Sequence, residues 1–149
     1  MDCEERIEEL LGKEYYLIDI FPERVPERAD GRYFDVEKIL RRDMQGFCRR
    51  ITNIILKLYC YCDMTAVTDK DTLTDPPAEK LAELTEGCLT GGGDTGHICI
   101  LLPEHDSLLT LSRDDMYATL YAPDERLKKL VSELCRSEGL FFVRPETRD

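Results

Sequence analysis

Tryptophan is absent from this sequence and histidine is scarce: of 149 residues, none is tryptophan and two are histidine. A mechanism that uses histidine as a general acid or base must therefore depend on His97 or His105. His105 stands between Glu104 and Asp106 in a predicted turn, which is an ordinary composition for a solvated turn. Histidine-dependent chemistry is thereby restricted to one candidate position, His97.

Long apolar runs are missing as well. The most apolar segments, 54–62 and 98–102, are shorter than the roughly 20 residues that a helix needs to span a bilayer. The first residues are acidic where a secretory leader would be basic, and no apolar segment follows them. We therefore expect no membrane partner.

The cysteines lack the pattern of a disulfide framework. They number seven, an odd count, and their spacing is irregular. Secreted domains that depend on disulfides carry cysteines in even number at characteristic spacings. We therefore expect reduced thiols and a cytoplasmic protein.

Basic side chains are outnumbered, with 20 lysines and arginines against 31 aspartates and glutamates and a formal net charge of −11. A field of that sign repels nucleic acid and anionic membranes, so we expect neither as a partner. Segment 35–59 is the exception, with six basic and three acidic side chains, whereas segment 60–115 carries three basic and 12 acidic ones. A protein partner could contact either of these two oppositely charged surfaces.

Length, periodicity and turn residues predict a single-domain α+β sandwich over residues 1–149. We predict strands over 15–20, 97–102, 108–111, 116–122 and 140–143. We predict helices over 3–11, 35–59, 76–86 and 124–138, and loops over 21–32, 63–77 and 91–96. The expected architecture is a mixed sheet of four to five strands with three to four helices packed mainly on one face.

The segment 35–59 has the strongest helical period, although 43–46 could divide it into two helices. Its apolar residues, among them Val36 and Leu40, gather on one side of the helix. Its basic residues gather on the other side, within about a third of the circumference, and suggest a site for a partner or an anion. These residues are Lys38, Arg42, Arg49, Arg50 and Lys57. The alternative is that they neutralise carboxylates of the same protein.

Two other arrangements suggest chemistry near His97. Cys60, Cys62, His97 and Cys99 could form a zinc site if two extended pairs lay on neighbouring strands, but burial as core thiols is the favoured interpretation. The glycine-rich loop from Gly91 to His97 could border a small-molecule site in which His97 and Cys99 share one face of a strand.

Tyrosines are a further candidate feature. Those on or near predicted strands could line a ligand groove, or could be edge residues with a buried ring and a solvated hydroxyl. They are Tyr15, Tyr16, Tyr59, Tyr61, Tyr117 and Tyr121. The sequence leaves both interpretations open.

No motif in the chain identifies a family, a reaction or a cofactor. The function that we favour is a non-enzymatic binding or adaptor domain that engages a protein partner through charged surface, with no metal or cofactor assigned. The alternatives are a sensor or enzyme with a site near the Gly91–His97 loop, and a zinc-stabilised module. A concave pocket that contains His97 would favour the sensor or enzyme.

Overall fold

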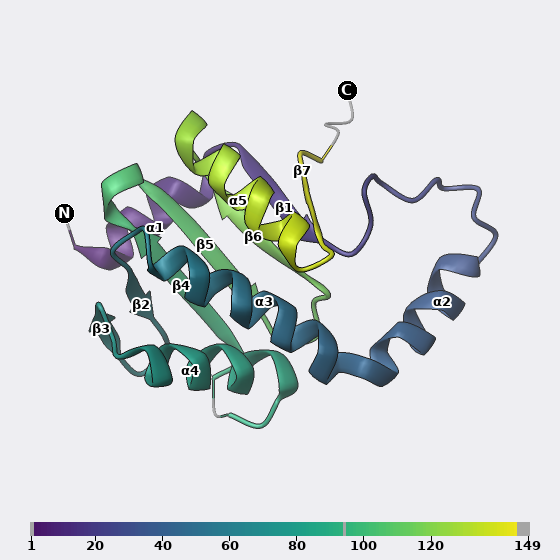
Figure 1. Ribbon diagram of the computed structural model, residues 1–149, viewed down its shortest axis with the longest axis horizontal. Helices are drawn as coiled ribbons and strands as arrows, with labels where there is room; N and C mark the ends of the chain where they lie inside the picture. The colour runs from purple at the N-terminus through teal and green to yellow at the C-terminus, as the bar shows by residue number, and fades with distance from the viewer. Residues whose placement is uncertain (1, 94, 146–149) are drawn as a thin grey trace.

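The computed structural model of the chain describes residues 2–93 and 95–145. Figure 1 shows an α+β arrangement in which helices pack on an open antiparallel sheet. The described residues form seven strands in the order β3-β2-β4-β5-β6-β1-β7, and every neighbouring pair is antiparallel. The predicted α+β class is confirmed.

The bounds of the elements follow the chain. The strands are β1 (Tyr15–Asp19), β2 (Thr65–Val67), β3 (Thr72–Thr74), β4 (His97–Leu102), β5 (Ser107–Ser112), β6 (Tyr117–Tyr121) and β7 (Phe141–Val143). The α-helices are α1 (Cys3–Leu11), α2 (Arg32–Leu40), α3 (Met44–Tyr59), α4 (Ala78–Thr90) and α5 (Glu125–Ser137). Two single turns of 3-10 helix are η1 (Arg41–Asp43) and η2 (Pro103–His105).

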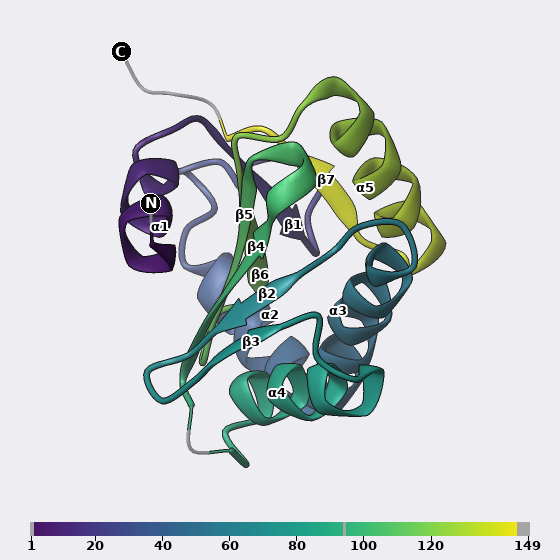
Figure 2. The same cartoon turned by 90° about the vertical axis from the view of Figure 1, so that its left-hand side faces the viewer.

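The two faces of the sheet are covered to different extents (Figure 2). Helices α3, α4 and α5 lie against one face, where Ile51, Ile55, Ile100 and Leu120 belong to the larger buried cluster. Helix α1 lies on the other face and covers only part of it, through a small cluster around Leu10 over β4 and β5. The prediction that helices pack mainly on one face is therefore confirmed, and part of the second face stays open.

The predicted strand count and the predicted mixed sheet were wrong. Segment 63–77, predicted as a loop, forms the hairpin of β2 and β3. Its turn is closed by the Thr68 hydroxyl, which accepts hydrogen bonds from the backbone N–H groups of Lys70 (3.2 Å) and Asp71 (3.0 Å). The sheet is antiparallel throughout because α4 and α5 each connect two strands that have another strand between them, β2 and β1 respectively.

Helix α4 continues beyond its predicted stop at Gly87 and ends at Thr90, followed by Gly91 in the left-handed conformation. Gly87 serves close packing instead. A Cβ atom at Gly87 would lie 3.2 Å from the Cα of Gly93, and the backbone N–H of Gly93 donates to the Gly87 carbonyl (3.1 Å). The glycine loop therefore folds back onto the helix that precedes it.

Segment 35–59 divides into α2 and α3 at η1. The side chain of Asp43 accepts a hydrogen bond from the backbone N–H of Gly46 (3.1 Å) and begins α3 there. Helix α3 buries the predicted apolar face, including Phe47, Ile51 and Ile54, whereas α2 contains no buried residue. Val36 and Leu40, predicted to share the apolar face of segment 35–59, are exposed and do not join the buried face of α3.

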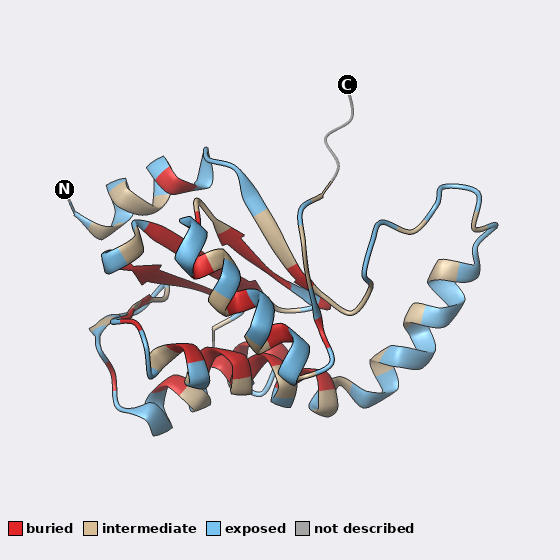
Figure 3. Cartoon of the chain, turned by 45° about the horizontal axis from the view of Figure 1, so that its top comes forward, coloured by how far each residue is buried: buried red, intermediate tan, exposed pale blue. Residues whose placement is uncertain are grey.

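The loop 20–31 and α2 together project from the body of the molecule, and we call residues 20–41 the arm (Figure 1). Helix α2 is mostly exposed along its length (Figure 3). The arm returns to the body through η1, which leads directly into α3. It stands beside the open part of the sheet, and this arrangement creates the candidate site.

Candidate binding groove

A groove of about 1050 Å³ lies between the arm and the open part of the sheet. Its floor is formed by alternate residues of β1 and β6, whose other residues, such as Ile18 and Leu120, point into the core. Three pairs of residues face each other across the two strands. They are Tyr15 with Tyr121, Leu17 with Thr119, and Asp19 with Tyr117.

The wall of the groove belongs to the arm. Tyr33 lies 5.5 Å from Phe34 and 6.0 Å from Phe21 between ring centroids, and its hydroxyl donates to a carboxylate oxygen of Glu37 (2.8 Å). Arg41 ties the end of α2 to the turn between β5 and β6, because its Nη2 donates to the backbone carbonyl of Asp114 (2.5 Å). These contacts hold the arm at the margin of the groove.

The groove is rich in carboxylates in a partly dehydrated setting. Burial raises the pKa of both Asp19 and Asp115. Burial also raises the pKa of Tyr117 and Tyr121, and together with the hydrogen bond to Glu37 it raises the pKa of Tyr33 to about 12. Tyr33, Tyr117 and Tyr121 therefore stay protonated at neutral pH and offer hydroxyl groups and ring faces to a ligand.

The five predicted binding cations do not form one continuous row. Lys38 lies on α2 and Arg42 in η1, whereas Arg49, Arg50 and Lys57 lie on α3. Lys57 is engaged internally, since its Nζ lies 2.8 Å from a carboxylate oxygen of Glu138 and 3.2 Å from the Ser137 hydroxyl.

In the part of the chain that the structure describes, the other four cations form no ion pair. Lys38 lies on the exposed helix of the arm and Arg42 in the turn that follows it. The proposal of a cationic contact surface is therefore retained for the four cations Lys38, Arg42, Arg49 and Arg50.

His97 and Cys99 are brought together, as their alternation on a strand suggested. Nε2 of His97 lies 3.4 Å from Sγ of Cys99, and Nδ1 lies 2.8 Å from the Ser112 hydroxyl on β5. Burial raises the pKa of the Cys99 thiol, which disfavours the nucleophilic thiolate. None of the three residues lines the groove, although His97 lies close enough to Asp115, which does line it, to influence its charge.

The four residues considered for zinc are otherwise distributed. Cys62 is buried in the cluster beneath α3, α4 and α5, and Cys99 belongs to the cluster beneath α1 on the other face of the sheet. Cys60 is exposed at the end of α3. Among residues 2–93 and 95–145, no group of three or more His, Cys, Asp or Glu side chains is arranged to hold a metal ion.

Three of the six tyrosines considered from the sequence, Tyr15, Tyr117 and Tyr121, do line the groove. Sequence reasoning missed the contribution of Asp19, Asp115 and the arm. The alternation of Tyr15, Leu17 and Asp19 was a usable signal for one shared face of β1. No comparable signal places α2 opposite that face, because the contact depends on the bend at η1.

Comparison of the chain with models of protein families, with curated proteins and with solved structures gives no significant match. No helix formed by the described residues is both long enough and apolar enough to cross a membrane.

Proposed function

We propose that this protein is a non-enzymatic binding domain that recognises a partner protein through the arm and the groove beside it. The observation that carries the proposal is the exposure of the apolar side chains of α2. Relative exposures are 65% for Phe34, 44% for Val36, 56% for Ile39 and 39% for Leu40. Val36, Ile39 and Leu40 lie on one side of α2, and Phe34 lines the groove, on an element that contains no buried residue.

The length of α2 strengthens this argument. Isolated helices shorter than about 12 residues are marginal in water, and most helices in proteins depend on the packing of an apolar face. Helix α2 has nine residues and lacks such packing. A partner that covered Val36, Ile39 and Leu40 would supply it, at roughly 25 cal/mol for each Å² of apolar surface removed from water.

The surroundings of α2 indicate the character of the partner surface. Val36 borders a second hollow of about 590 Å³, whose wall includes Val25 and Pro26 of the loop 20–31. Lys38 lies on α2 and Arg42 in the turn that follows it, and neither forms an ion pair within the described part of the chain. Such a surface fits a partner with an apolar contact bordered by carboxylates.

The geometry near His97 supports binding over catalysis. His97 is exposed, Cys99 is buried with a raised thiol pKa, and the large groove does not include them. The seven cysteines all lie among the described residues and are all free thiols. Free thiols persist in a reducing compartment, which supports the proposal of a cytoplasmic protein.

The proposal is tested by the double variant Val36→Ser with Ile39→Ser. Affinity capture from the native host should recover a partner with the unaltered protein and not with the variant. Because both side chains are exposed, the free energy of unfolding of the variant should lie within about 0.5 kcal/mol of that of the unaltered protein. Hydrogen exchange of the purified complex should then show new protection of the α2 amides.

The matched control is Leu11→Ser with Phe141→Ser, which removes exposed apolar side chains outside the arm. It should capture the partner normally. Equal capture by the arm variant, or unchanged exchange of α2 in the complex, would overturn the proposal. Light scattering of the purified protein gives its molar mass, which shows whether the partner is a second copy of this chain or a different protein.

A further inference from the structure

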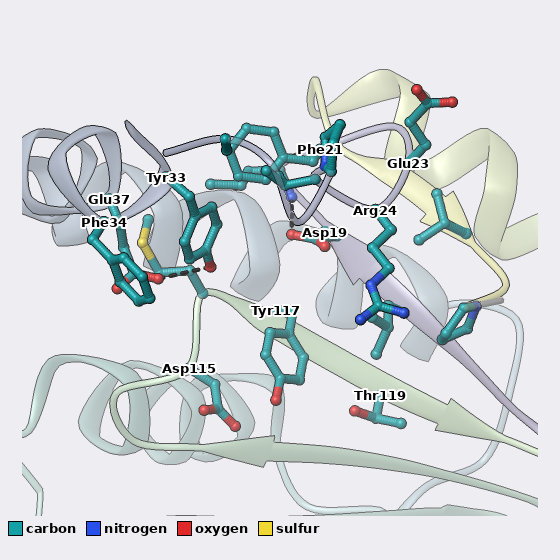
Figure 4. A pocket seen from close by; sticks show the side chains of 18 of the residues that line it. Asp19, Phe21, Glu23, Arg24, Tyr33, Phe34, Glu37, Asp115, Tyr117 and Thr119 are labelled. Atoms are coloured by element: carbon teal, nitrogen blue, oxygen red, sulfur yellow. Dashed lines mark hydrogen bonds between the residues drawn. The ribbon is translucent and has the colours of Figure 1, made fainter. Parts of the chain in front are cut away.

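One end of the groove combines aromatic rings with carboxylates. Asp19 lies opposite Tyr117 across β1 and β6, and Tyr33 of the arm lines the same part of the cavity. Figure 4 shows Asp19, Tyr117 and Asp115 gathered around the same part of the cavity. After burial, the nearby charge of Asp115 and of Asp19 raises the pKa of Tyr117 further, so the three side chains share one negative environment.

The charges around the groove are unequal. Three arginines line it, Arg24, Arg41 and Arg144. The carboxylates that line it are Asp19, Glu23, Glu27, Glu37, Asp114 and Asp115. The negative side therefore prevails in a cavity whose walls exclude part of the water, where charge interactions are stronger than in bulk solvent.

The arginines leave Asp19 without a counterion. Arg41 is held by Glu37, at 3.5 Å from its Nε, and by the carbonyl of Asp114. Arg144 lies over the ring of Tyr16, with its guanidinium carbon 5.3 Å from the ring centroid. Arg24 reaches over the groove (Figure 4) but forms no ion pair among the described residues. Asp19 instead accepts a hydrogen bond from the backbone N–H of Ile20 (2.6 Å).

We propose that this end of the groove is a binding site for an organic cation, an alkylammonium or guanidinium group. Asp19 and Asp115 would supply the opposite charge, and the rings of Tyr117 and Tyr33 would contact the alkyl stem and the charged head. The cation is a lysine or arginine side chain of a partner protein or a free amine. If the cation is a side chain of a partner protein, the inference rests on the proposed function; if it is a free amine, the inference is independent of it.

The test is an NMR titration of ¹⁵N-labelled protein with Nα-acetyl-lysine methylamide. Backbone amide signals of Leu17, Tyr117 and Thr119 should shift in a saturable manner. Nα-acetyl-norleucine methylamide has the same stem without the ammonium group and should bind at least about fivefold more weakly. Cadaverine serves as the free amine. If it binds as tightly as the lysine probe, the natural ligand is a free amine, and if it binds more weakly, the ligand is a side chain of a partner protein. Both outcomes support the cation site.

Charge variants of opposite sign complete the experiment. Asp19→Asn should lower the affinity for the lysine probe roughly fivefold. Arg24→Gln should raise that affinity, because the substitution removes a competing cation. Glu133→Gln, at an exposed position of α5 on the other side of the sheet, should leave the affinity for the lysine probe unchanged. Since burial disfavours the charged form of Asp19, Asp19→Asn should also raise the Tm at neutral pH, which excludes unfolding as the cause.

Equal binding of the norleucine probe, or unchanged binding by a folded Asp19→Asn variant, would overturn the cation site. That result would leave the proposed function intact if Val36→Ser with Ile39→Ser still abolished partner capture. Conversely, if the capture experiment overturned the proposed function of the arm, the lysine probe alone should still bind to the groove.

Discussion

Asp124 shows how one side chain serves two structural purposes at the start of α5. Its Oδ1 accepts a hydrogen bond from the backbone N–H of Leu127 (2.8 Å), which caps the helix, and its Oδ2 accepts one from Nδ1 of His105 (2.6 Å). Burial alone would raise the pKa of Asp124. The hydrogen bonds from His105 and from the backbone outweigh that effect and hold its pKa below the ordinary value of 3.8.

We predict that Asp124→Ala lowers the free energy of unfolding by about 1–2 kcal/mol at pH 7, the usual cost of losing an N-cap. Because the folded-state pKa is depressed, the contribution of the charge is complete above the unfolded-state pKa and is lost as the pH falls through the folded-state pKa. Urea denaturation at pH 7 and at pH 3 should therefore show a smaller difference between the two proteins at pH 3.

Asp124→Asn is the control, since asparagine caps helices about as well as aspartate but carries no charge. It should lose less stability than Asp124→Ala at pH 7. An alanine variant as stable as the unaltered protein at pH 7 would show that neither hydrogen bond matters for folding.

Helices α2 and α3 are adjacent in sequence but differ in how they are stabilised. Helix α3 buries seven side chains against the sheet and α4, whereas α2 buries none. Gly31, which precedes α2, adopts φ 79° and provides no side-chain cap. We predict that the amides of α2 exchange with solvent at least about 100-fold faster than those in the centre of α3, because opening α2 exposes no core.

Native-state hydrogen exchange followed by mass spectrometry checks this prediction on the isolated protein. Helix α5 is the internal control, since it buries Leu127, Val131 and Cys135 and should exchange slowly. Protection of α2 equal to that of α3 would mean that the arm is stabilised within the free molecule, and the exposed residues would then need no partner.

Sequence periodicity predicted those elements that bury one face against the core. The strands near 15–20, 97–102, 108–111 and 116–122 and the helices α1 and α5 were found close to their expected bounds. The hairpin of β2 and β3 was missed because its strands have three residues each, too few for alternation to be visible. The helix break at η1 was foreseen, but not the separation of α2 from the core.

The candidate groove was predictable only in part. Tyr15, Tyr117 and Tyr121 could be assigned to strands, but their meeting depends on β1 pairing with β6, which are distant in the chain. The basic residues of segment 35–59 were visible as a group, yet the pairing of Lys57 with Glu138 depends on α3 packing beside α5. Local pattern predicts which residues share a face, whereas the fold determines which faces meet.

The whole molecule carries a net charge of −11, and this charge is not balanced locally. The ion pairs among the described residues, such as Arg6 with Asp106 (2.7 Å) and Lys128 with Glu125 (2.9 Å), involve exposed partners. Exposed pairs contribute about 0–1 kcal/mol each. The general repulsion among carboxylates, including those along the groove, therefore opposes folding more than the few pairs favour it.

We predict that raising NaCl from about 20 mM to about 150 mM increases the Tm by about 2–4 °C, as expected for roughly 1 kcal/mol in a domain of this length. Salt shortens the distance over which like charges repel, and buried apolar contacts change little over this range. Thermal unfolding followed by circular dichroism measures the effect. The same concentrations of KCl should act alike, since screening depends on ionic strength. A Tm that fell with added salt would mean that the ion pairs outweigh the repulsion, and the surplus of negative charge would then be locally compensated in the folded molecule.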